Sequence, residues 1–257
     1  MIAVTVLLSL AASTANAADA IDTIARVKPS VVAVGTFERE RSPPFQFRGT
    51  GFAVENGTTI VTNAHVLPGV LDSARLESLA ILTPGASADT VQVRRARPLT
   101  IDREHDLALI RIDGAPLPSL QLGDSDSVRE GQEVLMTGFP IGSILGPFPA
   151  THHGMISAIT PIAIPQRTAA ELDPAVVSRL TRGTFPVFQL DATTYPGSSG
   201  SPVYDPSTGQ VFGIVNMTFV KGTKESALSQ PSGISYAVPA RYLQALLRNA
   251  PADASRK

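Results

Sequence analysis

The chain has 257 residues, is 43% hydrophobic, and carries 21 basic against 22 acidic side chains. This length and composition allow one substantial core or two closely packed halves of an all-β protein, and the near-zero net charge gives no reason to expect nucleic acid or an anionic membrane as partner. The absence of cysteine excludes disulfides, zinc–thiolate sites and thiol catalysis. A nucleophilic enzyme of this sequence would have to use Ser, Thr, Lys or a carboxylate.

The first 17 residues predict a cleaved signal peptide. An apolar stretch from Ile2 to Leu10 leads into small residues, and Ala15–Ala17 fits an A-x-A cleavage site. The apolar run is too short to span a bilayer, although no basic residue precedes it. We therefore expect a periplasmic or secreted bacterial protein with no membrane span in the mature chain. The folded domain is expected over 18–250, followed by a flexible tail at 251–257.

Short apolar runs bounded by Gly, Pro, Asn or Asp recur along the chain after a helical turn near residue 21. Such runs predict β-strands, and many short strands at fairly even spacing indicate an all-β barrel or sandwich. The predicted strands are 31–37, 49–54, 58–63, 106–112, 133–139, 153–159, 185–191, 210–219 and 233–238. Apolar residues at helical spacing over 240–248 predict a short closing helix.

Two segments do not fit the strand pattern. Residues 38–48, "ERERSPPFQFR", are charged and Pro-rich, which predicts a surface loop. Residues 161–185 form a longer insertion with a short helix predicted at Pro174–Leu180. Loops of this length in a compact domain are usually functional or disordered.

The stretch "TTYPGSSGSPVYD" (193–205) places three serines beside glycines. A catalytic serine needs a base to take its proton, usually a histidine oriented by a carboxylate, and backbone N–H groups to stabilise the oxyanion. Four histidines are available: His65, His105, His152 and His153. His65 follows a predicted strand, and His105 stands next to Asp106 where another strand begins. Any one histidine alone is more often a surface or core residue than a base.

Together, three segments resemble a known family. "TNAHVL", "HDLALIRI" and "GSSGSPV", in the chain order His, Asp, Ser, are similar to the signatures of chymotrypsin-fold serine proteases, especially bacterial HtrA/Deg-type trypsin-like peptidases. The flanking segments match as well, so the resemblance covers roughly residues 20–248. It implies two antiparallel six-stranded β-barrels with a short C-terminal helix, and a serine endopeptidase that acts on polypeptide substrates in protein processing or quality control, without a cofactor.

The resemblance also assigns roles to single residues. It implies that His65 is the general base, Asp106 the residue that orients it, and Ser199 the nucleophile, with the backbone N–H groups of Gly197 and Ser199 as the oxyanion hole. The family pattern Gly-x-Ser-Gly is met by residues 197–200. If Ser198 were the nucleophile, Pro196 would occupy the oxyanion position, and proline has no N–H to donate.

This chain departs from the commonest HtrA form in three ways. Ser201 stands where a glycine is usual and Ser198 where an asparagine is usual; both variants occur in related bacterial trypsin-like peptidases. HtrA proteins usually carry a C-terminal PDZ domain, and this sequence, in which the barrels run to about residue 250, is expected to be the peptidase domain without one. Relatives are often trimers, which suggests a homotrimer, and they carry activation loops in the region of the 161–185 insertion.

The resemblance places a primary substrate pocket between the segment leading to Ser199 and the strand after it. Thr193 falls near the pocket base, where a trypsin-type enzyme has an acid, and Ile214, Val215 and Asn216 would line the pocket or the substrate strand. A neutral residue at the base offers no counter-charge to Arg or Lys. We therefore expect small or medium apolar side chains at the cleaved position.

The sequence also allows functions other than proteolysis. A catalytically silent protease-fold module that binds proteins or acts as a chaperone is the main alternative. An α/β-hydrolase esterase fits poorly, because it needs Gly-x-Ser-x-Gly and the order Ser, Asp, His. No metal site is expected: adjacent strand residues such as His152 and His153 point to opposite faces, and Asp124 and Asp126 lack the spacing of a calcium loop.

Overall fold

The structure is a computed structural model that describes residues 19–84, 91–142, 146, 148–161, 184–216 and 233–251. The first six strands are β1 (Val31–Phe37), β2 (Phe45–Val54), β3 (Thr59–Asn63), β4 (Ser78–Pro84), β5 (Val91–Asp102) and β6 (Leu107–Ile112). The second six are β7 (Glu133–Gly138), β8 (Ala150–Pro161), β9 (Pro186–Asp191), β10 (Pro202–Tyr204), β11 (Val211–Val215) and β12 (Ile234–Pro239). The described helices are residues 19–27, η1 (Lys28–Ser30), η2 (Ala64–Val66) and α5 (Ala240–Arg248).

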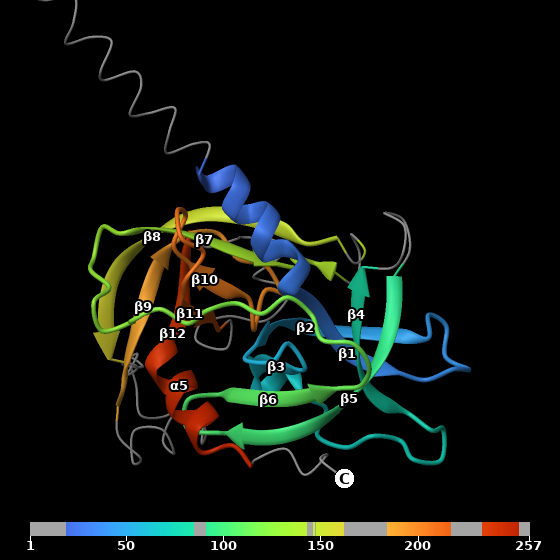
Figure 1. The fold of residues 1–257 in the computed structure, drawn as a ribbon. Coiled ribbons are helices and arrows are strands. Elements are labelled where there is room, and N and C mark those ends of the chain that lie inside the picture. The colour runs from blue at the N-terminus through green and yellow to red at the C-terminus, as the bar shows by residue number, and fades with distance from the viewer. Residues whose placement is uncertain are drawn as a thin grey trace, which may run out of the picture.

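The strands close into two antiparallel barrels, which confirms the predicted fold class (Figure 1). The first barrel has the order β1-β2-β3-β6-β5-β4 and the second β10-β11-β12-β9-β8-β7. Each barrel is built from one continuous half of the chain. Strands of the two halves therefore meet where the barrels pack against each other.

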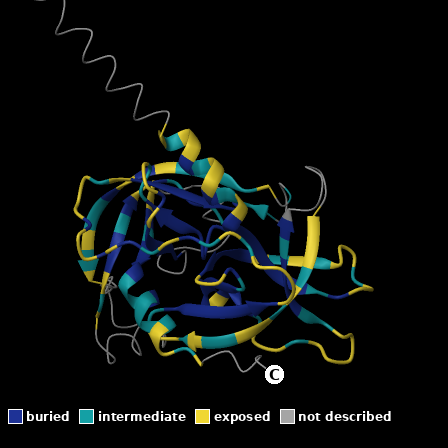
Figure 2. Cartoon of the chain, in the orientation of Figure 1, coloured by how far each residue is buried: buried dark blue, intermediate teal, exposed yellow. Residues whose placement is uncertain are grey.

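The sequence of β6 does not alternate between apolar and polar residues, because both faces of the strand are buried. Ala108, Ile110 and Ile112 point into the core of the first barrel. Leu107 and Leu109 belong to a second cluster that also contains residues of the other barrel, so they fill the interface between the barrels. A strand buried on both faces is expected to be largely apolar, and β6 is dark blue, the colour of buried residues, in Figure 2.

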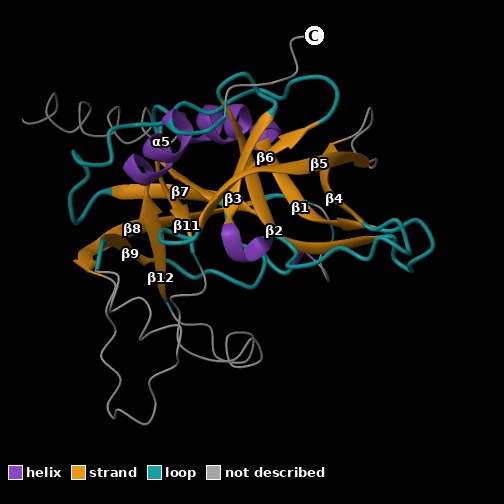
Figure 3. Ribbon diagram, turned by 90° about the horizontal axis from the view of Figure 1, so that it is seen from below, coloured by secondary structure: helices purple, strands orange, loops and turns teal. Residues whose placement is uncertain are grey.

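Helix α5 spans Ala240–Arg248, the range predicted from its apolar spacing. It packs against β11 and β12, and Ala240 and Leu243 are fully buried. In Figure 3 it lies at one side of the strands, away from η2. Among the described residues, no helix is long and apolar enough to cross a lipid bilayer.

Two sequence-based expectations need correction. The surface loop predicted for 38–48 ends before residue 48. Strand β2 already begins at Phe45, which pairs with Phe37 of β1. Strands β4, β5 and β10 were not among the predicted runs. The predicted signal peptide, the helix at Pro174–Leu180 and the tail after residue 251 lie outside the described residues.

Candidate active site

The structure brings His65, Asp106 and Ser199 together from three different loops. His65 lies in η2, directly after β3; Asp106 immediately precedes β6; and Ser199 lies in the turn before β10. The Nδ1 atom of His65 is 2.6 Å from Oδ2 of Asp106, and its Nε2 atom is 3.0 Å from Oγ of Ser199. The imidazole thus links a carboxylate on one side to a serine hydroxyl on the other, across the two barrels.

Asp106 is held in place by its backbone as well as its side chain. Its φ of 54° is in the left-handed region, which is uncommon for a residue other than glycine. Its carbonyl accepts hydrogen bonds from the backbone N–H of Ala64, at 3.0 Å, and from Nδ2 of Asn63, at 3.1 Å. The residues just before His65 are therefore tied to Asp106, which fixes the approach of the two side chains.

The Asp106 carboxylate accepts three hydrogen bonds. Oδ1 accepts the backbone N–H of His65 at 2.9 Å, and Oδ2 accepts the His65 ring and Nδ2 of Asn216, the latter at 2.8 Å. Burial pushes the pKa of Asp106 upward, but the hydrogen bonds and charge of His65 and the hydrogen bond of Asn216 outweigh it, so the pKa lies below its ordinary value. An ionised Asp106 accepts a proton-bearing Nδ1, which leaves Nε2 of a neutral His65 free of a proton and facing Ser199.

Asn216 makes a contact that the sequence did not suggest: it is fully buried, and its side chain donates to Asp106. Its predicted place along the pocket or the substrate strand stays a prediction. A polar residue directly after the apolar strand β11 was the only local signal. Its partner is 110 positions away in the sequence, so no local pattern could have identified the contact.

The glycines around Ser199 are required by the turn. Gly197 and Gly200 have φ values of 103° and 90°, a conformation that favours glycine. A Cβ atom on Gly197 would lie 2.5 Å from the carbonyl oxygen of Phe139, and one on Gly200 would lie 2.0 Å from that of Thr50. Side chains at these two positions would therefore collide with backbone.

The peptide between Pro196 and Gly197 has a defined orientation. The carbonyl of Pro196 accepts the backbone N–H of Ile141 at 2.8 Å. In a trans peptide the C=O and N–H groups point in opposite directions, so the N–H of Gly197 points away from Ile141. The role of this N–H as an oxyanion donor stays a prediction.

The other predicted pocket residues differ in exposure. Thr193 is half-buried, whereas Ile214 and Val215 are fully buried. Ile214 belongs to the cluster between the barrels, and Val215 to the core of the second barrel. Residues 217–232, which follow Asn216, lie outside the described residues, and the assignment of Thr193, Ile214 and Val215 to a pocket stays a prediction.

Two of the polar groups considered as metal ligands, His153 and Asp124, take part in other contacts. His152 is partly buried, which lowers its pKa, and His153 lies 3.7 Å from Glu133. Asp124 accepts the backbone N–H of Asp126 at 3.0 Å, as in a turn. Within the described ranges, no three His, Asp or Glu side chains are grouped so that they could hold a metal ion.

Comparison with protein families agrees with this geometry. Residues 49–214 match the family model of the trypsin-like peptidase domain, so the chain belongs to this family. It is similar to a probable periplasmic serine endoprotease DegP-like of Halomonas elongata, with 30% identity over 74% of this chain and 32% of the relative. It is also 31% identical to mitochondrial serine protease HTRA2 of Bos taurus, over 88% of this chain and 42% of the relative.

The fold also resembles solved HtrA-type structures. The HtrA-type protease AlgW with a tripeptide matches with a TM-score of 0.62 and 25% identity, over 89% of this chain and 62% of that chain. This chain spans about a third of the length of the DegP-like relatives, as the 32% and 38% coverages show. The similarity thus concerns the peptidase domain of these longer proteins.

Proposed function

We propose that this chain is a serine endopeptidase with Ser199 as nucleophile, His65 as general base and Asp106 as the residue that orients His65. The observation that carries the proposal is the chain of contacts from Ser199 Oγ through His65 to Asp106, at 3.0 and 2.6 Å. Membership of the trypsin-like peptidase family and the names of the DegP-like and HTRA2 relatives support it.

The proposed reaction has two halves. As Ser199 Oγ attacks the peptide carbonyl, Nε2 of His65 takes its proton, and Asp106 stabilises the imidazolium. The backbone N–H groups of Gly197 and Ser199 would donate to the oxyanion. The tetrahedral intermediate collapses when His65 protonates the leaving amine, which leaves an acyl-enzyme. Water then attacks the acyl-enzyme with His65 again as base, and collapse of the second intermediate releases the acid and restores Ser199.

A fluorophosphonate probe tests the nucleophile directly. Wild-type protein should be labelled, Ser199→Ala should not, and Ser198→Ala should keep labelling. Ser198 is the matched control because it is the neighbouring buried serine. Thermal unfolding checks that the wild-type protein is folded. If the folded wild type does not react with the probe, the catalytically silent binding module is favoured instead.

We infer polypeptide substrates with small or medium apolar side chains at the cleaved position. The AlgW structure contains a tripeptide, and Thr193 offers no charge at the predicted base of the pocket. A peptide-library digest checks the preference. Cleavage after Lys or Arg would contradict it.

We propose a periplasmic or secreted location and a homotrimer. The location is supported by the predicted signal peptide and by the DegP-like relatives, which are named periplasmic. Fractionation of expressing cells tests it: retention in the cytoplasm with residues 1–17 intact would contradict the proposal. Sedimentation of the purified protein tests the trimer, and a monomer at all concentrations would exclude it.

A further inference from the structure

Thr50 of the first barrel contacts the Ser199 loop of the second barrel through both its backbone and its side chain. It lies on β2 and is fully buried. Its backbone N–H donates to the carbonyl of Ser199 at 2.8 Å, and its hydroxyl Oγ1 is 2.8 Å from the carbonyl oxygen of Gly197. Its own carbonyl accepts the hydroxyl of Thr62 at 2.7 Å. All of its polar groups are thus engaged inside the protein.

The direction of the Thr50 hydroxyl is determined by its two partners. The backbone N–H of Phe139 points at Oγ1 from 3.1 Å and can only donate. The carbonyl of Gly197 can only accept. A threonine hydroxyl has one hydrogen and two lone pairs, so its hydrogen must point at Gly197. The contact is therefore a donated hydrogen bond that holds the Gly197 carbonyl in one orientation.

This hydrogen bond acts on a part of the chain with little steric resistance to rotation. Gly197 has no Cβ, so the peptide groups on either side of it can turn with little steric resistance. The peptide before Gly197 is held through Pro196 by the N–H of Ile141, at 2.8 Å. The peptide after Gly197 is held at its carbonyl by Thr50 and at its N–H, that of Ser198, by the carbonyl of Tyr195 at 2.9 Å. With both peptides fixed, the N–H directions of Gly197 and Ser198 are fixed as well.

We propose that Thr50 is a positioning residue for the oxyanion hole: its hydroxyl, carried by the first barrel, holds the carbonyl of the peptide that follows Gly197 and thereby limits rotation about Gly197, whose own N–H belongs to the preceding peptide. The inference rests on the proposed function, in which Gly197 donates to the oxyanion. It adds that the hole is complete only when the two barrels are docked. The fit is tight, since a Cβ atom on Gly138 would lie 3.0 Å from the Thr50 hydroxyl.

Three variants test the role of the hydroxyl. Thr50→Val has nearly the same shape but cannot hydrogen-bond, and Thr50→Ser keeps the hydroxyl. Thr137→Val is the matched control, because Thr137 is also fully buried and its hydroxyl also has two partners, Thr151 and Tyr204, at 2.9 and 2.7 Å. Thermal unfolding of each variant sets a temperature at which all are folded.

Peptide hydrolysis by the full chain gives the first measurement. Loss of an oxyanion donor lowers kcat by about 10²- to 10³-fold in other proteases, so a misdirected donor should lower kcat by about 10- to 100-fold in Thr50→Val, with KM within about twofold. Thr50→Ser and Thr137→Val should stay within about threefold of wild type. A folded Thr50→Val whose kcat matches that of Thr137→Val would overturn the proposal.

The amide resonance of Gly197 in ¹⁵N-labelled protein gives a second measurement that does not depend on activity. Thr50→Val should shift this resonance more than Thr50→Ser or Thr137→Val does. If the wild type hydrolyses no peptide, the proposed function fails, while the Gly197 resonance still decides whether Thr50 positions the peptide. Equal shifts in Thr50→Val and Thr137→Val would refute the positioning role in either case.

Discussion

Two pairs of histidine and aspartate lie close together in this protein, and they are built alike. In both, Nδ1 of the histidine is 2.6 Å from Oδ2 of the aspartate: His65 with Asp106, and His105 with Asp102. In both, the other carboxylate oxygen accepts the backbone N–H of the same histidine, at 2.9 and 3.1 Å. The geometry of the carboxylate contact does not distinguish them.

The surroundings of the two rings are what differ. Nε2 of His65 faces Ser199, and the His65 side chain is 32% exposed. The His105 side chain is 17% exposed, and its ring stacks on Tyr242 of α5 with centroids 4.1 Å apart and contacts the edge of Phe185 at 4.7 Å. His105 therefore joins the turn before β6 to α5 and to the segment before β9. A carboxylate orients either imidazole, but the ring of His65 also has a serine hydroxyl at its second nitrogen, which is why His65 is the proposed base.

The largest effect that separates the pairs should come from removing each histidine. His65→Ala should lower kcat by at least about 10⁴-fold, because the proton of Ser199 then has no acceptor. His105→Ala should leave kcat/KM within about tenfold of wild type, but should lower the free energy of unfolding by about 1–3 kcal/mol, since it removes a hydrogen bond and an aromatic stack. Steady-state kinetics and chemical denaturation measure the two effects.

The control for this comparison is His105→Phe, which keeps an aromatic ring against Tyr242 but loses the contact with Asp102. It should recover part of the stability lost in His105→Ala. If folded His105→Ala lost as much activity as His65→Ala, the distinction between the two pairs would be wrong.

Substitution of the two aspartates should also affect kcat unequally, with the larger loss at Asp106. Asp106→Asn should lower kcat by about 10⁴-fold at neutral pH, because an amide no longer favours a proton on Nδ1 of His65. Asp102→Asn should change kcat by less than about tenfold and act mainly on stability. Both are measured on the same peptide substrate, and equal losses in kcat would contradict the assignment.

The sequence was most informative where local pattern and structure coincide. The bounds of β1 and α5 followed from apolar spacing, and the segments carrying His65, Asp106 and Ser199 were found by their order along the chain. Strand β5 was missed because most of it is exposed and it carries arginines and a proline, which hide any alternation. Its pairing with β4 and β6 is a property of the closed barrel.

The hydrogen bonds that support the site could not be predicted from the sequence for a different reason. Thr50 reaches Gly197 across 147 positions and Asn216 reaches Asp106 across 110. Each belongs to one barrel and acts on the other. Such contacts depend on how the barrels dock, and a threonine within a strand or an asparagine just after one occurs in any β protein.

Asn216 supplies the next prediction, of intermediate size. Asn216→Ala removes a hydrogen bond that lowers the pKa of Asp106, so that pKa should rise. A hydrogen bond to a charged group contributes about 1.5–3 kcal/mol, part of which serves to hold Asp106 against His65, so kcat should fall by about tenfold. The exposed Asn249→Ala is the control. No change in kcat for Asn216→Ala would exclude a role in orienting Asp106.

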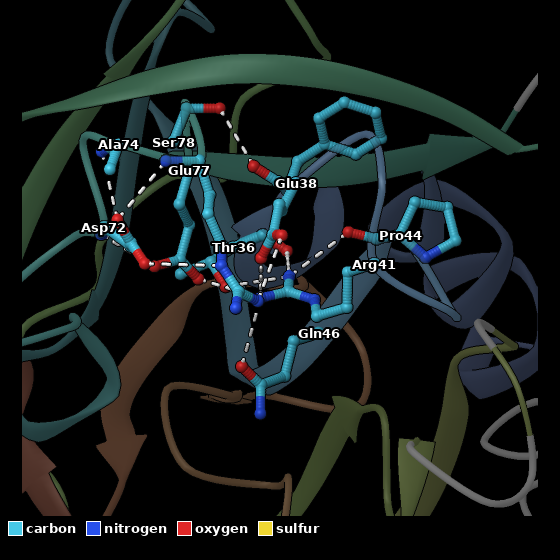
Figure 4. A network of polar contacts seen from close by, with 11 residues as sticks. Thr36, Glu38, Arg41, Pro44, Gln46, Asp72, Ala74, Glu77 and Ser78 are labelled. Atoms are coloured by element: carbon cyan, nitrogen blue, oxygen red, sulfur yellow. Dashed lines mark hydrogen bonds and ion pairs between the residues drawn. The ribbon is translucent and has the colours of Figure 1, made fainter.

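The smallest expected effect is on thermal stability and comes from Glu77, which lies outside the site. Like that of Asp106, the pKa of its carboxylate is lowered. Glu77 accepts hydrogen bonds from the Thr36 hydroxyl and the Asp72 backbone N–H and pairs with Arg41 at 2.9 Å, which together hold its pKa at about 2, from an ordinary 4.5 (Figure 4). These contacts join the loop after β1 to the loop before β4, away from the contacts of Ser199 and His65.

The sign of the Glu77 effect follows from its lowered pKa. The folded protein binds a proton on Glu77 less readily than the unfolded chain, so its contribution to stability is complete above pH 4.5 and is lost as the pH falls toward 2. Glu77→Gln should lower the Tm by no more than about 2–4 °C at neutral pH, because such ion pairs contribute little, and the difference from wild type should vanish near pH 2. Its kcat should equal that of wild type, in contrast to Asp106→Asn. A constant difference in Tm across this pH range would mean that Glu77 acts through packing, because only the loss of an ionised carboxylate produces a difference that disappears in acid.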